Sequence, residues 1–509
     1  MHRIFIGTIL LLSFATIVWA QTFGPVVLVD TSTANLTYQA GGNLAVDYQG
    51  SLGVAWTDAT NNNDIISFAK STDQGQTWQK TVVCDDPLED PRDMRLDAAL
   101  AFNPIDNPWV VWDYYIWESI SEYWVQAAQS VDGGVTFENQ RIIELSNFRV
   151  SKTIAIDNNS TVYIPSVDYR GLICNVLPEG DFSKRYQTVV SPLSLAPFDF
   201  PDFQTAGRDT IFIAFKADSS DHYKPKLIYF TQSIDAGSTF TEPILISGEA
   251  YQPGHYGAQS ASLALDELKT IYLAWADDRT GDYDVYFSKS IDGGNTFSSS
   301  VRVNNQLEGQ QFIVRISYNS STGLCVAWVE THDLQDNDIY FARSIDGGET
   351  FSDGILICGE EHQAFYQGLG GIATDDSGNV YIAYTDNRFG KQLLFVTKAT
   401  LESTNVIEHP SLLALPEKAT LQQNYPNPFN AETLIRYQIP NNSYRVTLRI
   451  FDLLGRVVKT LVDQRQDGGD YQIVWDGKDK DGKDVGSGVY FCSLTVGPVL
   501  CARKIVLIR

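Results

Sequence analysis

Aspartate and arginine recur together in segments that read as loops between short apolar runs. Three of these loops are Ser166–Gly171 (SVDYRG), Ala274–Asp284 (AWADDRTGDYD) and Ala383–Gly390 (AYTDNRFG). A fourth segment, Asp90–Asp97 (DPRDMRLD), connects one repeat of strands to the next. A guanidinium can grip a carboxylate through two parallel hydrogen bonds, so these residues could hold an acidic group of a ligand. They could also brace their own loops, which we favour because the motif repeats. The ligand-binding candidates are Arg92, Arg95, Asp168, Arg170, Asp278, Arg279, Asp386 and Arg388.

An eight-residue motif, S-x-D-x-G-x-T followed by an aromatic residue, occurs five times. The copies are STDQGQTW (71–78), SVDGGVTF (130–137), SIDAGSTF (233–240), SIDGGNTF (290–297) and SIDGGETF (344–351). The Asp carboxylate can accept hydrogen bonds from N–H groups of its own turn, and the following Gly can adopt positive φ. We therefore interpret these aspartates as structural: Asp73, Asp132, Asp235, Asp292 and Asp346.

The spacing of this motif, known as the Asp-box, predicts the fold. Successive box aspartates are 59, 103, 57 and 54 residues apart, so one repeat between Asp132 and Asp235 lacks a box. Such a period, with several short strands in each repeat, is typical of an all-β propeller. We expect seven blades over residues 21–399, or six if the boxless repeat is an insertion.

The start of the propeller predicts how the ring closes. Residues 22–29 (TFGPVVLV) resemble residues 239–246 (TFTEPILI), which follow the third box, whereas the last repeat supplies three strands and then stops. Phe23–Val29 should therefore pair as the outermost strand of the blade containing Tyr381–Tyr384. Closure of this kind removes open sheet edges.

The bulk composition limits partners and location. Residues 1–20 read as a secretory signal peptide, with a short basic start, an apolar stretch and Val18-Trp19-Ala20 as the cleavage site, and no other segment approaches the length of a membrane span. The net charge of −25 argues against nucleic-acid binding. No cofactor or metal site is expected. Six cysteines form no CxxC pair; Cys84, Cys174, Cys325 and Cys358 suit buried positions, while Cys492 and Cys501 could pair across a hairpin or remain free.

The C-terminal part has a different character. Residues 400–420 read as a linker, and residues 421–509 carry 12 Lys+Arg against 9 Asp+Glu, a net charge of +3 that leaves −28 on residues 1–420. Alternating strands with Gly/Asp turns predict a small β-sandwich. QQNYPNPFN (422–430), IFDLLGRVV (450–458) and WDGKDKDGKDVGSGVYF (475–491) resemble the Ig-like C-terminal sorting domain of type IX secretion substrates. That resemblance implies export by the type IX machinery to the outer-membrane surface or the extracellular space of a bacterium.

The propeller resembles the sialidase superfamily, in which Asp-boxes are common. That resemblance implies cleavage of terminal sialic acid by three arginines, a Tyr/Glu nucleophile pair and an Asp acid/base. The Arg-Ile-Pro signature of the family is absent, and the nearest string, Phe148-Arg149-Val150, lacks its proline, so no residue is matched to those roles. We therefore prefer a non-catalytic protein that binds a glycan or an extracellular protein. An exo-glycosidase of sialidase type is the alternative.

Overall fold

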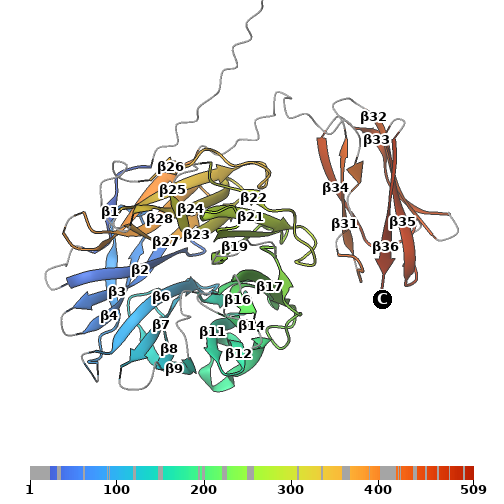
Figure 1. The fold of residues 1–509 in the computed structure, drawn as a ribbon. Helices are drawn as coiled ribbons and strands as arrows, with labels where there is room; N and C mark the ends of the chain where they lie inside the picture. The colour runs from blue at the N-terminus through green and yellow to red at the C-terminus, as the bar shows by residue number, and fades with distance from the viewer. Residues whose placement is uncertain are drawn as a thin grey trace, which may run out of the picture. The chain divides into compact units, whose positions relative to one another are not determined.

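The computed structural model divides the chain into two compact units, Met1–Ser403 and Thr404–Arg509 (Figure 1). It describes residues 23–30, 36–60, 63–88, 90, 92–117, 122–146, 153–192, 195–197, 201–219, 226–248, 257–305, 309–333, 336–357, 367–388, 390–401, 420–421, 424, 426–430, 432–439, 444–452, 456–466, 469–480, 482–496 and 499–508. The predicted signal peptide, most of the predicted linker, and Cys358 lie outside these residues.

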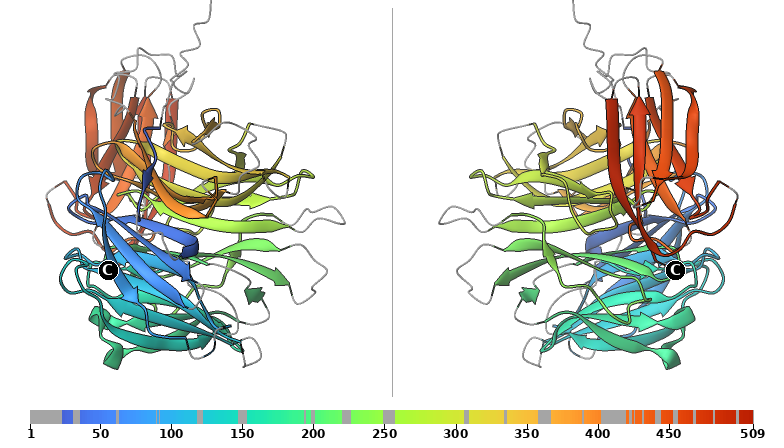
Figure 2. Two further views of the ribbon diagram at one scale, coloured as in Figure 1. Left: turned by 90° about the vertical axis from the view of Figure 1, so that its left-hand side faces the viewer. Right: turned by 90° about the vertical axis from the view of Figure 1, so that its right-hand side faces the viewer.

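The first unit contains seven antiparallel sheets, the blades of a propeller (Figures 1 and 2). Blade 1 comprises β2 (Leu36–Val46), β3 (Leu52–Thr60), β4 (Asp64–Ser71) and β5 (Gln79–Cys84). Blade 2 comprises β6 (Met94–Phe102), β7 (Pro108–Ile116), β8 (Glu122–Gln129) and β9 (Glu138–Ser146). Blade 3 comprises β10 (Ala155–Ile156), β11 (Val162–Asp168), β12 (Gly171–Leu177) and β13 (Tyr186–Pro192).

Blade 4 has a divided inner edge, where β14 (Leu195–Pro197) and β15 (Asp202–Ala206) both pair with β16 (Thr210–Ser219), followed by β17 (Leu227–Ser233) and β18 (Ile244–Leu245). Blade 5 comprises β19 (Ala258–Leu265), β20 (Ile271–Asp277), β21 (Asp284–Ser290) and β22 (Val301–Arg302). Blade 6 comprises β23 (Gln310–Asn319), β24 (Gly323–Asp333), β25 (Asp336–Ser344) and β26 (Ile355–Leu356). Blade 7 comprises β27 (Gln367–Thr374), β28 (Asn379–Asp386), β29 (Leu393–Thr400) and β1 (Val27–Leu28).

The ring closes as predicted. β1 pairs with β29, with Val27 opposite Val396 and Leu28 opposite Phe395, in the sheet that contains Tyr381–Tyr384. The segment is thus the outer strand of blade 7, so the first and last parts of the propeller form one sheet. The expectation of seven blades is confirmed.

The second strands are mainly apolar and buried on both sides because both faces of each blade are covered by its neighbours. All seven residues of β20 (IYLAWAD) are buried, including Trp275. A sheet with one face in water would instead alternate apolar and polar residues. The core of the propeller therefore lies between blades.

Each box aspartate is hydrogen-bonded within its own turn. In the box of blade 1, Asp73 Oδ1 accepts hydrogen bonds from Ser71 Oγ at 2.8 Å and from the Thr77 N–H at 2.9 Å, while Oδ2 accepts from Thr77 Oγ1 at 2.6 Å. Asp292 is bonded in the same way by Ser290 and Thr296. These carboxylates are saturated by their turns, which supports a structural role.

The box also fastens one blade to the one before it. Gly348, at φ +86°, packs so closely against Phe287 of β21 that an added Cβ would lie 2.1 Å from the ring, and the box aromatic Phe351 meets the same ring edge-on at 5.3 Å. Phe68 and Phe230 meet the boxes of the following blades similarly. The glycine and the aromatic residue of the motif thus form a clamp on the preceding blade.

Blade 3 rebuilds this clamp without a box. The turn between β12 and β13 contains two short 3-10 helices, Pro178–Gly180 and Phe182–Lys184. Gly180, at φ +69°, approaches Trp109 of blade 2, and the Phe182 ring lies 5.6 Å from that indole. A different turn sequence therefore places the same pair of residue types against the preceding blade.

The box carboxylates should couple stability to acid. Hydrogen bonds from the Thr77 side chain and backbone lower the pKa of Asp73 to about 2, below the value of about 3.9 for an unfolded chain. This stabilisation is complete above about pH 5 and is lost as pH falls toward 2. The difference in unfolding free energy between wild type and Asp73→Asn should therefore narrow from pH 5 to pH 2 in denaturant titrations. If the difference in unfolding free energy between the two proteins did not change with pH, the hydrogen bonds of the box would not lower the pKa of Asp73.

The second unit is an Ig-like β-sandwich. One sheet contains β30 (Thr420–Leu421), β31 (Thr433–Ile439) and β34 (Gly469–Trp475), and the other is ordered β33 (Val457–Gln466), β32 (Tyr444–Phe451), β35 (Gly488–Val496) and β36 (Val499–Leu507). Its core surrounds Trp475, which contacts Phe429 and Tyr490 with ring centroids 5.4 and 5.3 Å away. Cys492 is a buried free thiol opposite Arg503, two positions out of register with Cys501, which lies opposite Leu494.

Candidate functional site

Antiparallel pairing gives the propeller two faces with different loops. The links between blades and the loops from second to third strands lie at one end, which we call the loop face. The box turns lie at the other end, the box face. All five candidate arginines belong to the loop face, each on its own blade or blade link.

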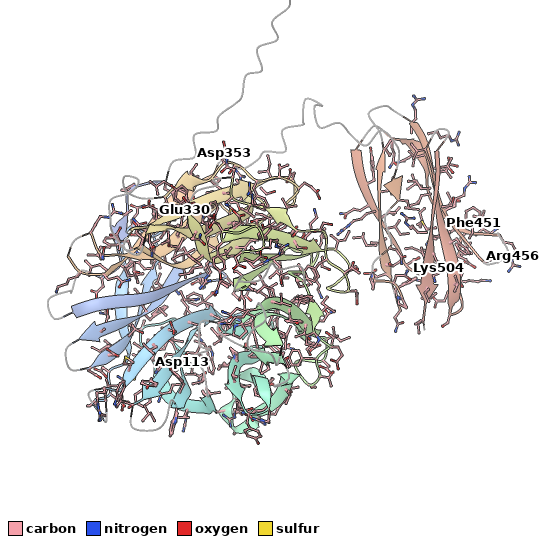
Figure 3. The ribbon with its side chains drawn as sticks, in the orientation of Figure 1. Asp113, Glu330, Asp353, Phe451, Arg456 and Lys504 are labelled. Atoms are coloured by element: carbon pink, nitrogen blue, oxygen red, sulfur yellow. The ribbon has the colours of Figure 1, made fainter. Side chains whose placement is uncertain are left out.

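A buried carboxylate lies near the loop-face end of the second strand in six blades, and none is more than 8 % exposed. Two of them, Asp113 on β7 and Glu330 on β24, are labelled in Figure 3. Burying a charge is costly unless hydrogen bonds compensate it. The six residues are Asp58, Asp113, Asp168, Asp277, Glu330 and Asp386.

In three blades this carboxylate is bonded by the arginine two positions later. Arg170 Nε donates to Asp168 Oδ2 at 2.8 Å, and Arg388 Nε donates to Asp386 Oδ2 at 2.7 Å. The backbone N–H of each arginine donates to the same aspartate at 2.7 and 2.8 Å. These candidate residues are therefore brought together in pairs that brace their own loops.

Arg279 and Asp278, adjacent in sequence, have different partners. Arg279 donates from Nε to Asp277 Oδ1 at 2.7 Å, whereas Asp278 accepts a hydrogen bond from the Gly257 N–H at 2.9 Å. Asp277 also accepts from Trp275 Nε1 at 2.7 Å. The Arg279 N–H also donates to Asp277 Oδ1 at 3.1 Å, and this turn, closed by the aspartate side chain, brings the residue two positions later onto the carboxylate. The repeated spacing Asp-x-Arg in the other two loops was the signal for Asp277.

The remaining two arginines differ in burial. Arg95 is 4 % exposed, and its guanidinium donates to Asn63 Oδ1 at 3.2 Å and to the backbone carbonyls of Asp64 and Asp86. It therefore holds the loop of blade 1 against the start of blade 2. Arg92 is exposed and pairs with Asp90, with Nε at 2.9 Å and Nη2 at 2.7 Å from its carboxylate.

Removing a buried brace should be costly. Asp277→Ala should lower the free energy of unfolding by about 3 kcal/mol, because it leaves the Arg279 charge and the Trp275 N–H without their acceptor. Lys184→Ala, which removes an exposed ion pair with Glu179, should cost far less, because water screens that pair. Denaturant titration of both variants measures the contrast. Equal losses of unfolding free energy in the two variants would contradict the bracing role of Asp277.

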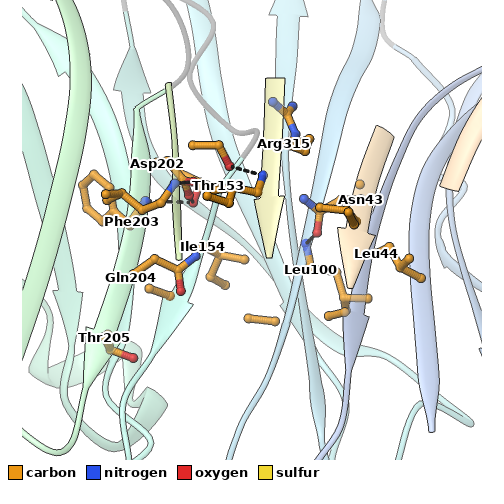
Figure 4. Close-up of a pocket in the computed structure, with 18 of the residues that line it drawn as sticks. Asn43, Leu44, Leu100, Thr153, Ile154, Asp202, Phe203, Gln204, Thr205 and Arg315 are labelled. Carbon is orange, nitrogen blue, oxygen red and sulfur yellow. Dashed lines mark hydrogen bonds between the residues drawn. The ribbon is translucent and has the colours of Figure 1, made fainter. Parts of the chain in front are cut away.

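A cavity of about 290 Å³ lies at the centre of the propeller, lined by inner strands of all seven blades. Figure 4 shows Asp202 and Thr153 on one side of it and Arg315 beside another strand. Its volume is close to the lower end of the range for small-molecule sites. Its polar lining includes Asn43, Thr153, Asp202, Gln204, Ser262 and Arg315.

The polar residues of this cavity have a structural task. Each inner strand is a sheet edge, so the N–H groups on its open side lack a strand partner. Asn43 Oδ1 accepts from the Leu100 N–H at 3.1 Å, Thr153 Oγ1 from the Phe203 N–H at 3.2 Å, and Asp202 Oδ2 from the Leu263 N–H at 2.7 Å. Ser262 Oγ accepts from the Ile316 N–H at 3.3 Å. Each bond joins one inner strand to the next blade.

Arg315 reverses the direction of these bonds. Its Nε donates to the Gly370 carbonyl at 3.2 Å and its Nη1 to the Val314 carbonyl at 3.0 Å. Burial lowers the pKa of Arg315, with the negative charges of Asp202 and Asp97 opposing this shift, and burial raises the pKa of Asp202. Sequence analysis did not single out Arg315 or Asp202, because neither belongs to a repeated motif.

Two findings concern cofactors and membranes. Among the residues that the structure describes, no cluster of three or more His, Cys, Asp or Glu side chains could hold a metal ion. In the same residues, no helix is long and apolar enough to cross a membrane.

Fold and site together define a seven-bladed β-propeller followed by an Ig-like domain. Residues 427–497 match the family of the FlgD Ig-like domain. No curated protein matches the chain in sequence.

Solved structures with similar folds include glycosidases and a secretion component. The Hadza microbial sialidase Hz136 is 15 % identical in sequence, with a TM-score of 0.44. The match covers 75 % of this chain and 69 % of the sialidase chain. The α-L-arabinanase of Penicillium chrysogenum is 11 % identical with a TM-score of 0.44, covering 74 % and 98 %. PorZ of the type-IX secretion system of Porphyromonas gingivalis is 13 % identical with a TM-score of 0.40, covering 92 % and 59 %.

Proposed function

We propose that this chain is a secreted or cell-surface propeller protein that binds a glycan or an extracellular protein through its loop face. The observation that carries the proposal is the bonding of Arg170, Arg279 and Arg388, each to a carboxylate of its own loop. Such repeated braces give a rigid loop face. Each guanidinium is held within its own loop, whereas a catalytic centre gathers side chains of several loops around one reacting group.

The C-terminal domain belongs to the same proposal. Its match to the FlgD Ig-like domain and its basic balance, opposite to that of the propeller, support a separate task. We assign it the export of the chain through the type IX machinery. Surface attachment and release are both compatible with that task.

A glycosidase of sialidase type is the second candidate. The observation that favours it is Asp202, whose pKa burial raises and whose side chain lines the central cavity. A carboxyl group with a raised pKa can act as a general acid.

A glycan array followed by a sialoside hydrolysis assay separates these functions. The preferred proposal predicts saturable binding of the full mature chain without release of sialic acid. Hydrolysis that disappears in Asp202→Asn would establish the enzyme instead. Absence of both binding and hydrolysis would leave the protein-binding form of the proposal, to be measured by cross-linking at the cell surface.

A further inference from the structure

A group of aromatic residues lies at the loop-face end of blade 2. Trp117 follows β7 directly and is 51 % exposed. The Tyr115 ring meets it edge-on, with centroids 6.3 Å apart, and the Tyr123 ring lies 5.0 Å from Tyr115. None of these three residues lines the central cavity. Tyr115 therefore supports the exposed indole and Tyr123 supports Tyr115, while the indole itself is a flat apolar surface partly open to solvent.

The position of this surface is fixed by a buried carboxylate. Asp93, which is 3 % exposed, accepts hydrogen bonds from the Trp117 N–H at 2.9 Å and from Tyr114 Oη at 3.0 Å. The Asp93 N–H donates to the Asp90 carbonyl at 2.9 Å, which closes the turn of the blade link, and the two bonds to the Asp93 carboxylate hold that link against the end of β7. The indole is therefore presented on a rigid base, and little conformational entropy is lost when a ligand covers it.

A charged pair lies against the indole and covers part of its ring. The Arg92 guanidinium lies over the Trp117 ring, 5.7 Å from its centroid, and is bonded through Nε and Nη2 to Asp90. Arg92 carries hydrogen-bond donors and Asp90 carries acceptors, and both are partly exposed. A flat apolar face beside a donor and an acceptor matches a pyranose ring, whose C–H face is apolar and whose rim carries hydroxyl groups.

The charge of the chain selects among glycans. Residues 1–420 carry a net charge of −28, and such a surface repels polyanions. The single arginine of the cluster is already paired with Asp90, so the cluster adds no uncompensated positive charge. Neutral sugars are therefore favoured over sialylated or uronic-acid chains.

We propose that Trp117, Tyr115, Arg92 and Asp90 form a binding site for a neutral pyranose glycan on blade 2, in which the Trp117 indole stacks on a sugar ring. This site rests on the proposed function, because it specifies the ligand class and the part of the loop face that binds it. It lies apart from the residues of the central cavity.

Isothermal titration of the full mature chain with neutral hexasaccharides of mannose, glucose and xylose tests the site, with hexagalacturonate and sialyllactose as acidic probes. At least one neutral hexasaccharide should bind, and the acidic probes should bind at least tenfold more weakly. Trp117→Ala should weaken neutral binding at least tenfold, because a central aromatic contact is lost. Trp117→Phe should recover most of the binding, because a ring remains.

Tyr48→Ala is the matched control, since Tyr48 is an aromatic residue 63 % exposed in the turn between β2 and β3 on the box face. It should leave binding unchanged, and thermal unfolding should show that all three variants are folded. Neutral binding that survives Trp117→Ala would overturn this site while leaving glycan binding by the propeller intact. Preferential binding of the acidic probes would overturn the ligand class. Absence of binding by wild type to any probe would overturn both the site and the glycan form of the proposed function.

Discussion

Gly348→Ala is expected to lower the free energy of unfolding by about 4 kcal/mol. Gly348 has φ +86°, a conformation that strains any residue with a Cβ, and the added atom would lie 2.1 Å from the Phe287 ring. Because Phe287 is buried between Gly348 and Phe351, it cannot move away without opening the contact between blades 5 and 6. Urea titration of the purified chain measures the effect.

Gly50→Ala separates the two causes. Gly50 has nearly the same φ, +84°, but nothing lies within 4 Å of an added Cβ. Its substitution should cost about 1 kcal/mol, the backbone strain alone. A double-mutant cycle with Phe287→Leu should show coupling to Gly348→Ala, since a smaller side chain leaves room for the methyl group. Equal losses for Gly50→Ala and Gly348→Ala would show that the clamp between blades contributes nothing.

The contact of the box glycine and aromatic residue with the preceding blade shows which part of the fold could be predicted from the sequence. The motif repeats, so its aspartate and glycine could be assigned to a turn. Its five copies, the double gap between Asp132 and Asp235 and the three strands of the last repeat predicted seven blades with their closure, with six as the alternative. The contact of Gly348 with Phe287 joins residues of different blades, and no periodicity within one blade reveals it. In blade 3 the same contact is made by Gly180 and Phe182, in a turn without the motif.

In the candidate site, too, the residues of a repeated motif could be predicted from the sequence, and the contacts between different blades could not. The Asp-x-Arg spacing identified two of the three braces, and Asp277 was missed because Asp278 stands next to the arginine in sequence. The bond from the Ile316 N–H to Ser262 spans 54 residues and depends on which inner-strand side chain faces the next edge. One-residue changes in register, such as the bulge between Gln259 and Ala261, decide that question, and sequence patterns do not locate them.

Removal of residues 421–509 should leave a folded propeller that is no longer delivered to the cell surface. All strands of the seven blades lie between Val27 and Thr400, and blade 7 is completed by β1 rather than by any strand of the C-terminal unit. The C-terminal unit has its own hydrophobic core around Trp475. The truncated chain should therefore keep the thermal stability of its propeller. It retains residues 1–20, the predicted signal peptide, and should cross the inner membrane by them.

In a host with type IX machinery, the truncated chain should accumulate in the periplasm, and at least nine-tenths of the surface signal should be lost in fractionation and whole-cell labelling. The matched control is a reporter protein that carries residues 1–20, the predicted signal peptide, and residues 400–509. It should reach the surface because the proposed export information lies in the C-terminal unit. Normal surface delivery of the truncated propeller would refute the sorting role. Retention of the reporter in the periplasm would show that export also requires the propeller.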